Sequence, residues 1–170
     1  DAGSLNATER DLAEQIFRVM MRDAALRVRE ALSKNLKACA FLPHDVALAL
    51  ANDVVTVAVP VLEASEVLTD SDLLEIIEKQ GAEKQLAISR RRQVSEQVSD
   101  ALVETGEPKV VASLVRNEGA MLSEKSLHKV IDGFGESDLI QEPIVTRAQL
   151  PVSISERLVT LVSDNLREHL

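Results

Sequence analysis

Apolar residues recur at helical spacing along most of this sequence, and short polar or glycine-containing breaks interrupt them. The first helix is expected from about Thr8 to Met21, with Thr8 as its N-cap. Its apolar residues are Leu12, Ile16, Val19 and Met20. A second helix is expected to start near Asp23. Because the turn between the two is so short, residues 8–37 are predicted to form an antiparallel helix pair.

The apolar pattern then repeats at intervals of 26, 26, 28 and 28 residues. Each repeat opens with an apolar residue followed by Pro, Thr or Ser, which are residue types suited to a helix start. These pairs are Leu42-Pro43, Leu68-Thr69, Val94-Ser95, Leu122-Ser123 and Leu150-Pro151. The eighth and ninth positions after each opening residue are apolar again: Leu50-Ala51, Ile76-Ile77, Leu102-Val103, Val130-Ile131 and Leu158-Val159. A second short helix is expected to end near Leu36, Leu62, Ile88, Leu114 and Ile144.

A period of this length holds two helices of about ten residues and two tight turns. Neither helix can bury its apolar stripe alone, so adjacent pairs are expected to stack. The sequence therefore predicts an all-α fold, a right-handed α-solenoid of about five short two-helix repeats. Residues 1–170 would form a single helical-repeat domain, with the helix pair at 8–37 and repeats over 42–170 that open at 42, 68, 94, 122 and 150. An irregular helical bundle is the alternative.

Two segments resemble HEAT-like repeats: residues 23–32, which are rich in alanine and contain Val-Arg, and residues 53–62, which have a late proline at Pro60. Residues 68–92, 94–102 and 141–151 are similar to a bacterial family, found mainly in alphaproteobacteria, that is described as a domain of unknown function with HEAT-like repeats. The resemblance covers most of residues 8–170. It implies HEAT-like repeats and a bacterial cytoplasmic setting, and it supplies no catalytic residues.

Composition restricts the classes of partner. The 170 residues carry a formal net charge of −9, and 45% are hydrophobic, but only three are aromatic and none is Trp or Tyr. Few side chains are therefore available to stack on bases, and the net charge repels a phosphate backbone, so nucleic acid is a disfavoured partner. No apolar run is long enough to span a membrane, and the single cysteine forms no internal disulfide, which favours the cytoplasm. Because the chain begins with Asp1, it is expected to be a fragment of a longer protein.

The sequence offers little catalytic chemistry. Its six glycines lack the spacing of a phosphate-binding loop and are interpreted as turn residues. Cys39 lies among apolar neighbours and is expected to be a small buried hydrophobe, while His44 and His128 are expected on the surface. No catalytic residue, metal ion or cofactor is expected. The protein is predicted not to be an enzyme.

Two charged regions are candidate binding surfaces. Residues 38–78 contain eight acids and no Lys or Arg, and the candidates among them are Glu63, Glu66, Asp72, Glu75 and Glu78. Near the ends of successive second helices lie Arg90, Arg91, Arg116 and, one residue later in its repeat, Arg147. Each region also has a structural interpretation, since acids near helix starts and cations near helix ends both favour the helix dipole.

These features predict a protein-interaction scaffold or regulatory adaptor whose protein partner is not identified by the sequence. A small-ligand sensor or lyase-like enzyme of helical-repeat fold is the alternative, and nucleic-acid binding through the arginines is a third. The last helix, over 151–170, carries an apolar stripe that no later repeat covers, so a homodimer through this helix is a further possibility. Its residues are Ile154, Leu158, Leu161, Val162 and Leu166.

Overall fold

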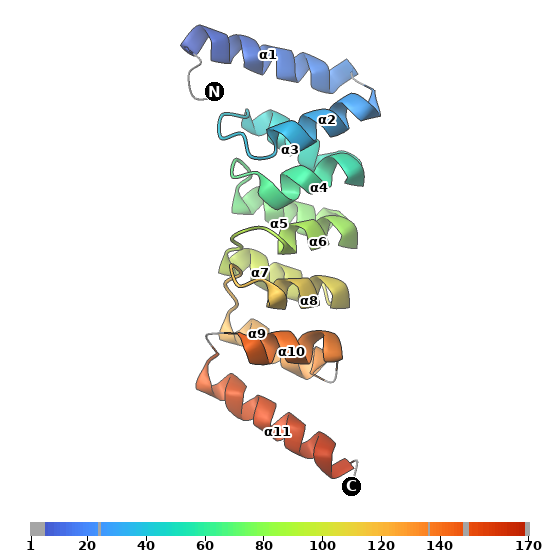
Figure 1. The fold of residues 1–170 in the computed structure, drawn as a ribbon, viewed down its shortest axis with the longest axis vertical. Helices are drawn as coiled ribbons and strands as arrows, with labels where there is room; N and C mark the ends of the chain where they lie inside the picture. The colour runs from blue at the N-terminus through green and yellow to red at the C-terminus, as the bar shows by residue number, and fades with distance from the viewer. Residues whose placement is uncertain (1–5, 24, 136, 148–149, 169–170) are drawn as a thin grey trace. The chain divides into compact units, whose positions relative to one another are not determined.

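A computed structural model describes residues 6–23, 25–135, 137–147 and 150–168 of the chain. These residues form eleven helices (Figure 1) and no strand, which confirms the all-α prediction. The helices are α1 (Ala7–Asp23), α2 (Leu26–Leu36), α3 (His44–Asn52), α4 (Val55–Ala64), α5 (Asp70–Lys79), α6 (Ala82–Ser89), α7 (Glu96–Glu104), α8 (Pro108–Arg116), α9 (Glu124–Phe134), α10 (Asp138–Thr146) and α11 (Val152–Glu168). None of these helices, over the described residues, has the length and apolar character needed to cross a membrane.

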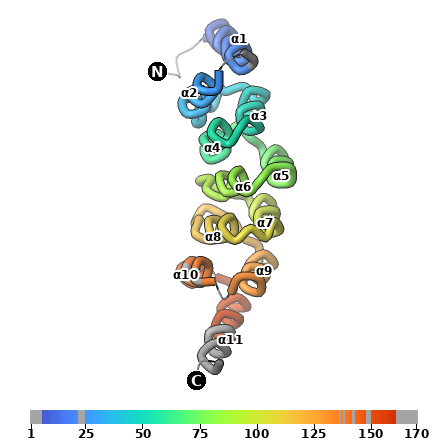
Figure 2. The backbone as a smooth tube through the Cα atoms, turned by 90° about the vertical axis from the view of Figure 1, so that its right-hand side faces the viewer, coloured from blue at the N-terminus to red at the C-terminus, as the bar shows by residue number. Residues whose placement is uncertain are grey.

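The chain divides into two compact units, Asp1–Ile88 and Ser89–Leu170, which we call unit 1 and unit 2. In each unit the helices alternate between two layers (Figure 2). In unit 1, α4 packs against both α2 and α3. In unit 2, α8 packs against α10, and α9 packs against α7 and α11. Successive helix pairs therefore stack within each unit, while the prediction of a HEAT-like solenoid over the whole chain stays a prediction.

The predicted helix starts are confirmed at the residues that open the repeats. The hydroxyl oxygens of Thr69, Ser95 and Ser123 accept hydrogen bonds from the backbone amides three residues later, at 3.4, 3.4 and 3.0 Å. Asp72 completes a capping box by accepting the Thr69 amide at 2.7 Å. Pro43 is the N-cap of α3 rather than a residue of its first turn. Capping thus fixes where the first helix of a pair begins.

The apolar eighth and ninth positions of the repeat are buried in the first four repeats. In the fifth repeat, Leu158 is half-buried and Val159 is 67% exposed. Ile154 of the same helix is buried, whereas the side chains of Leu161, Val162 and Leu166 lie outside the described residues.

The predicted N-cap of the first helix is wrong, and the second helix begins at Leu26 rather than near Asp23. Asn6, not Thr8, caps α1: its side-chain oxygen accepts the Glu9 amide, and the Glu9 carboxylate accepts the Asn6 amide, both at 2.9 Å. Because Asn6 and Glu9 bond each other's backbone amides in this way, the helix begins at Ala7, directly after Asn6. At the other end α1 continues to Asp23 and α2 begins only at Leu26. The apolar stripe of α1 is exposed, with Leu12 at 58% and Val19 at 64%.

Ser99 of α7 is fully buried, and its hydroxyl has no hydrogen-bond partner among the described residues. The equivalent positions in other repeats are the buried apolar residues Ala47, Leu73 and Leu127. We expect Ser99→Ala to raise the free energy of unfolding by about 1 kcal/mol, because it removes an unpaired buried hydroxyl. Urea denaturation followed by circular dichroism measures this change.

Ser126→Ala is the matched control for Ser99→Ala. Ser126 is also a buried serine of unit 2, but its hydroxyl donates to Asp100 Oδ1 at 2.5 Å. Its replacement is expected to lower the free energy of unfolding by about 1 kcal/mol, since a hydrogen bond is lost. If both variants were destabilised equally, the Ser99 hydroxyl would have to be bonded in solution.

Candidate functional site

Two loops of unit 2, which follow α6 and α8, lie side by side and share backbone hydrogen bonds. The Val94 amide donates to the Gly119 carbonyl at 3.1 Å, and the Met121 amide donates to the Val94 carbonyl at 2.9 Å. These bonds create an isolated parallel bridge between Val94 and Ala120. The loops approach so closely that a Cβ atom at Gly119 would lie 2.0 Å from the Arg92 carbonyl oxygen. Only glycine fits there without a backbone shift.

Asn117 and Arg147 join this structure through their side chains. Each is the C-cap of the second helix of its pair, α8 and α10 respectively. The Asn117 amide nitrogen donates to the carbonyls of Ser89 at 2.9 Å and Arg91 at 2.7 Å. The Arg147 guanidinium donates to the carbonyls of Val115 at 2.8 Å, Asn117 at 3.2 Å and Ala120 at 2.7 Å. In both cases a C-cap side chain satisfies carbonyls at or just beyond the end of an earlier helix.

Four arginines are carried on these two tied loops. Arg90 and Arg92 are exposed and Arg91 is half-buried, and all three lie directly after α6. Arg116 is exposed at the end of α8, and its guanidinium donates to the Leu139 carbonyl at 3.5 Å. Because the next residue, Asn117, binds the Arg91 carbonyl, Arg116 is adjacent to the loop of the other three. We call these four residues, Arg90, Arg91, Arg92 and Arg116, the arginine edge.

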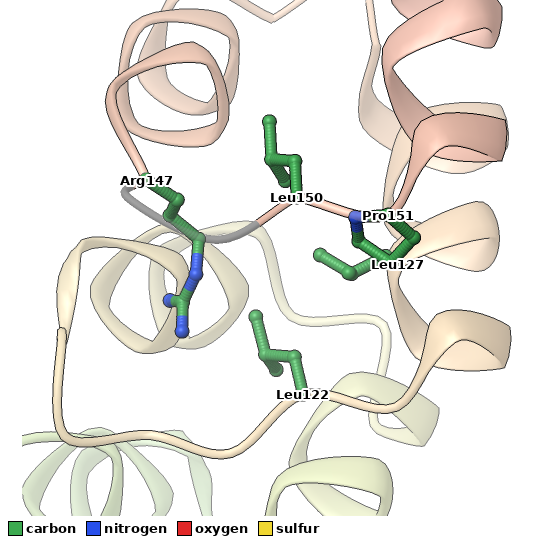
Figure 3. Close-up of a pocket in the computed structure, with 5 residues that line it drawn as sticks. All are labelled: Leu122, Leu127, Arg147, Leu150 and Pro151. Atoms are coloured by element: carbon green, nitrogen blue, oxygen red, sulfur yellow. The ribbon is translucent and has the colours of Figure 1, made fainter.

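The sequence predicted that Arg147 would continue this group of arginines. In the structure, its side chain instead donates to backbone carbonyls of the loop after α8. Its side chain is half-buried, and burial lowers the pKa of Arg147 while the charge of Glu118 raises it. It lines a cavity of about 330 Å³ (Figure 3). The other lining residues are Leu122, Leu127, Leu150 and Pro151. Arg147 is equivalent to Asn117 rather than to Arg116, and its one-residue offset in the repeat was the sequence signal of this difference.

The acidic candidates lie in unit 1, where several have internal roles. Asp72 caps α5 and also lies 2.8 Å from His44 Nε2. Burial raises the pKa of Asp72, but hydrogen bonds from His44 and Thr69 outweigh that effect and hold the pKa below its usual value. Glu75 pairs with Lys79 at 2.7 Å. Of the others, Glu63 is half-buried, and Glu66 and Glu78 are exposed.

Cations from outside residues 38–78 compensate part of the acidic stretch. Arg18 of α1 pairs with Asp45 at 2.9 Å, and Arg29 of α2 pairs with Asp53 at 2.6 Å. Lys84 is buried, and its ammonium donates to the Ala51 carbonyl at 3.1 Å. Burial lowers the pKa of Lys84, and the charge of Asp53 opposes this shift. Sequence reasoning missed the two pairs because their partners are 27 and 24 residues apart, which is about one repeat period.

Residues 57–170 match the model of a domain family described as an uncharacterised protein conserved in bacteria, DUF2336. The chain belongs to this family. The DUF2336 match confirms the bacterial domain-of-unknown-function part of the resemblance, and it includes all four residues of the arginine edge. The alphaproteobacterial and HEAT-like parts stay predictions. No curated protein and no solved structure matches the chain.

Within the described part of this DUF2336 chain, no three His, Cys, Asp or Glu side chains gather as they would around a metal ion. Besides the cavity beside Arg147, unit 2 has an open one of about 820 Å³. Its lining residues are Pro108, Ile131, Asp132, Gly133, Phe134, Gly135, Ser137 and Arg157. Neither cavity is lined by Cys39 or His128. Cys39 itself is half-buried.

Proposed function

We propose that this DUF2336 protein is an interaction module of the bacterial cytoplasm, a scaffold or regulatory adaptor that binds a partner protein on the surface of its helical repeats. We further propose that these repeats are short HEAT-like repeats of a right-handed α-solenoid. The recurrence of the same cap and core positions in successive helix pairs supports the second statement. The arginine edge supports the first, because it offers exposed charge on a backbone that is held in place.

Several acids of the unit 1 stretch already have roles inside the fold. A side chain that already forms an ion pair gains little binding energy from a second oppositely charged partner. A carboxylate that caps a helix stabilises that helix and is not available to a ligand. Asp72 and Glu75 have such roles, and Arg18 and Arg29 neutralise two further acids of the stretch.

Affinity capture with charge-reversed variants of the full chain tests this function. We expect Arg90→Glu with Arg116→Glu to lower the yield of the captured partner from the source bacterium about tenfold or more, since electrostatic complementarity is inverted. The acidic variant, Glu75→Lys with Glu78→Lys, is expected to retain the partner. Circular dichroism verifies that both variants keep the helix content of the wild type. If both variants captured every partner of the wild type, neither surface would be the binding site.

A further inference from the structure

We infer that the open cavity of about 820 Å³ in unit 2 binds a small aromatic carboxylate, through apolar contacts with its ring and a guanidinium contact with its carboxylate. Cavities of this volume are typical of small-molecule sites. The start of α8, the end of α9, the N-cap of α10 and the middle of α11 form its walls. None of its described lining residues belongs to the arginine edge, so the inference goes beyond the proposed function and does not depend on it.

The space beside the last turn of α9 is open because two of the residues that line it are glycines. Gly133 lies within α9, and Gly135 is its C-cap. A Cβ atom added at Gly133 meets no other part of the fold within 4 Å. Glycine is unfavourable inside a helix, so Gly133 lowers the stability of α9 while it leaves room that a ligand can fill.

Apolar side chains supply the surface for a flat ring. Pro108, Ile131 and Phe134 line the cavity, with Ile131 buried and Phe134 half-buried. Phe134 is the single aromatic residue in the sequence of unit 2, since the other two phenylalanines are Phe17 and Phe41. Aromatic rings attract one another in offset and edge-to-face arrangements, beyond the effect of the apolar area that they bury. An aromatic body is therefore the apolar part that this cavity fits best.

Arg157 of α11 supplies the charged contact. Its Nη2 atom lies 3.2 Å from Asp132 Oδ1, and the two side chains are 46% and 58% exposed. Such an exposed ion pair is weak, so a ligand carboxylate can replace Asp132 at little cost. A guanidinium presents its donors in pairs that match the two oxygens of a carboxylate. In addition, α8 and α10 begin at the cavity and only α9 ends there, so the helix dipoles favour an anion over a cation.

The smaller cavity of unit 2, beside Arg147, is less suited to a carboxylate. The Arg147 guanidinium already donates to the carbonyls of Val115, Asn117 and Ala120. A ligand there would compete with the bonds that hold the loop after α8. The described residues that line this cavity also include no aromatic side chain. We therefore assign the ligand to the larger cavity.

Fluorescence titration of the full chain with naphthoate tests the inference. Because the chain has no Trp or Tyr, the fluorescence of a naphthalene ring is read without a protein background. The comparison probes are naphthamide, which has the same ring and no charge, and naphthylmethylammonium, which is a cation. We expect naphthoate to bind about tenfold or more tighter than either, since both lack the carboxylate that a guanidinium binds. Tighter binding of the cation, or no saturable binding of naphthoate up to about 5 mM, would overturn the inference.

Substitutions in the Asp132–Arg157 pair are expected to act in opposite directions. Arg157→Gln should weaken naphthoate binding about tenfold and leave naphthamide binding within about twofold. Asp132→Asn should strengthen naphthoate binding about two- to fivefold, because it removes a competing carboxylate. Arg10→Gln is the matched control, since it removes an exposed cation from α1 and should change the affinity for naphthoate less than about twofold. Equal effects of Arg157→Gln and Arg10→Gln would show that the ligand senses only the overall charge, contrary to the inference.

Filling the cavity locates the ligand. Gly133→Leu places a side chain in the open space and is expected to weaken naphthoate binding about tenfold or more. Gly81→Leu is the control, because a Cβ at Gly81 in unit 1 also meets no atom within 4 Å, and it should change the affinity less than about twofold. Circular dichroism verifies that both variants keep the helix content of the wild type. If Gly133→Leu bound naphthoate as the wild type does, or if NMR amide shifts moved around Arg147 instead of at residues 131–135, the assignment of this cavity would be wrong.

Discussion

Gly119→Ala is expected to lower the free energy of unfolding of unit 2 by about 3 kcal/mol or more, at the upper end of the range for overpacking substitutions. The added Cβ would lie 2.0 Å from the Arg92 carbonyl oxygen and 3.0 Å from its carbon. Both are backbone atoms, so no side chain can rotate away to make room. The two loops would have to separate, and separation breaks the Val94–Gly119 hydrogen bond.

Gly133→Ala is the matched control for this variant. Gly133 lies within α9 of the same unit, and a Cβ there meets no other atom within 4 Å. Its replacement is expected to raise the free energy of unfolding by about 0.5–1 kcal/mol, because alanine favours a helix over glycine. Urea denaturation followed at 222 nm gives both values, since the chain has no Trp or Tyr to report by fluorescence. Hydrogen exchange should localise the Gly119→Ala effect to residues 89–94 and 117–121. An unchanged urea midpoint would show that the loops are separated in solution.

The helix starts and most of the core could be predicted from the sequence because both depend on local chemistry. A hydroxyl oxygen at Thr69, Ser95 or Ser123 satisfies an amide only three residues away, so its role is visible in a short window. The eighth and ninth positions after each opening residue follow from helical periodicity and from the presence of a second helix. The ninth position of the fifth repeat, Val159, is an exception, because its side chain is exposed.

The candidate site could be predicted only in part, because it depends on contacts between repeats. Gly119 was interpreted as one turn glycine among six, and nothing in its local sequence indicates the approach of Arg92. The Arg18–Asp45 and Arg29–Asp53 pairs likewise join residues about one period apart. A charge count over a continuous window overlooks such pairs. Aligning the repeats before pairing charges would have found them, since partners separated by one period occupy adjacent helix pairs.

Arg147 shows how a shift of one residue changes the role of a side chain. In the sequence it resembled Arg116, because both follow the last apolar residue of a second helix. In the structure Arg116 is the last residue of α8, whereas Arg147 is the C-cap of α10 and is equivalent to Asn117. A C-cap side chain in this fold donates to carbonyls near the end of an earlier helix, which explains why Arg147 is half-buried and Arg116 is exposed. Arg147 therefore contributes to stability, whereas Arg116 lies exposed where a partner can reach it.

Arg147→Ala is expected to lower the free energy of unfolding of unit 2 by about 2–4 kcal/mol, because hydrogen bonds from a charged donor are strong and the carbonyls left behind lose their partner. Three carbonyls, those of Val115, Asn117 and Ala120, would be affected. Arg147→Lys is expected to restore less than half of this loss, since a single ammonium does not reproduce the planar fork of a guanidinium. Thermal and urea denaturation by circular dichroism measure both variants.

Arg116→Ala is the control that separates stability from binding. Arg116 has one long contact, 3.5 Å to the Leu139 carbonyl, and is exposed, so its removal should cost less than about 0.5 kcal/mol of stability. In the affinity-capture assay the order reverses: Arg116→Ala should lower the yield of the captured partner, and Arg147→Ala should leave the yield for the folded protein within about twofold. If Arg147→Ala were as stable as the wild type but lost the partner, Arg147 would belong to the binding surface after all. Its three carbonyl contacts would then be dispensable for the fold, contrary to the geometry of the two loops.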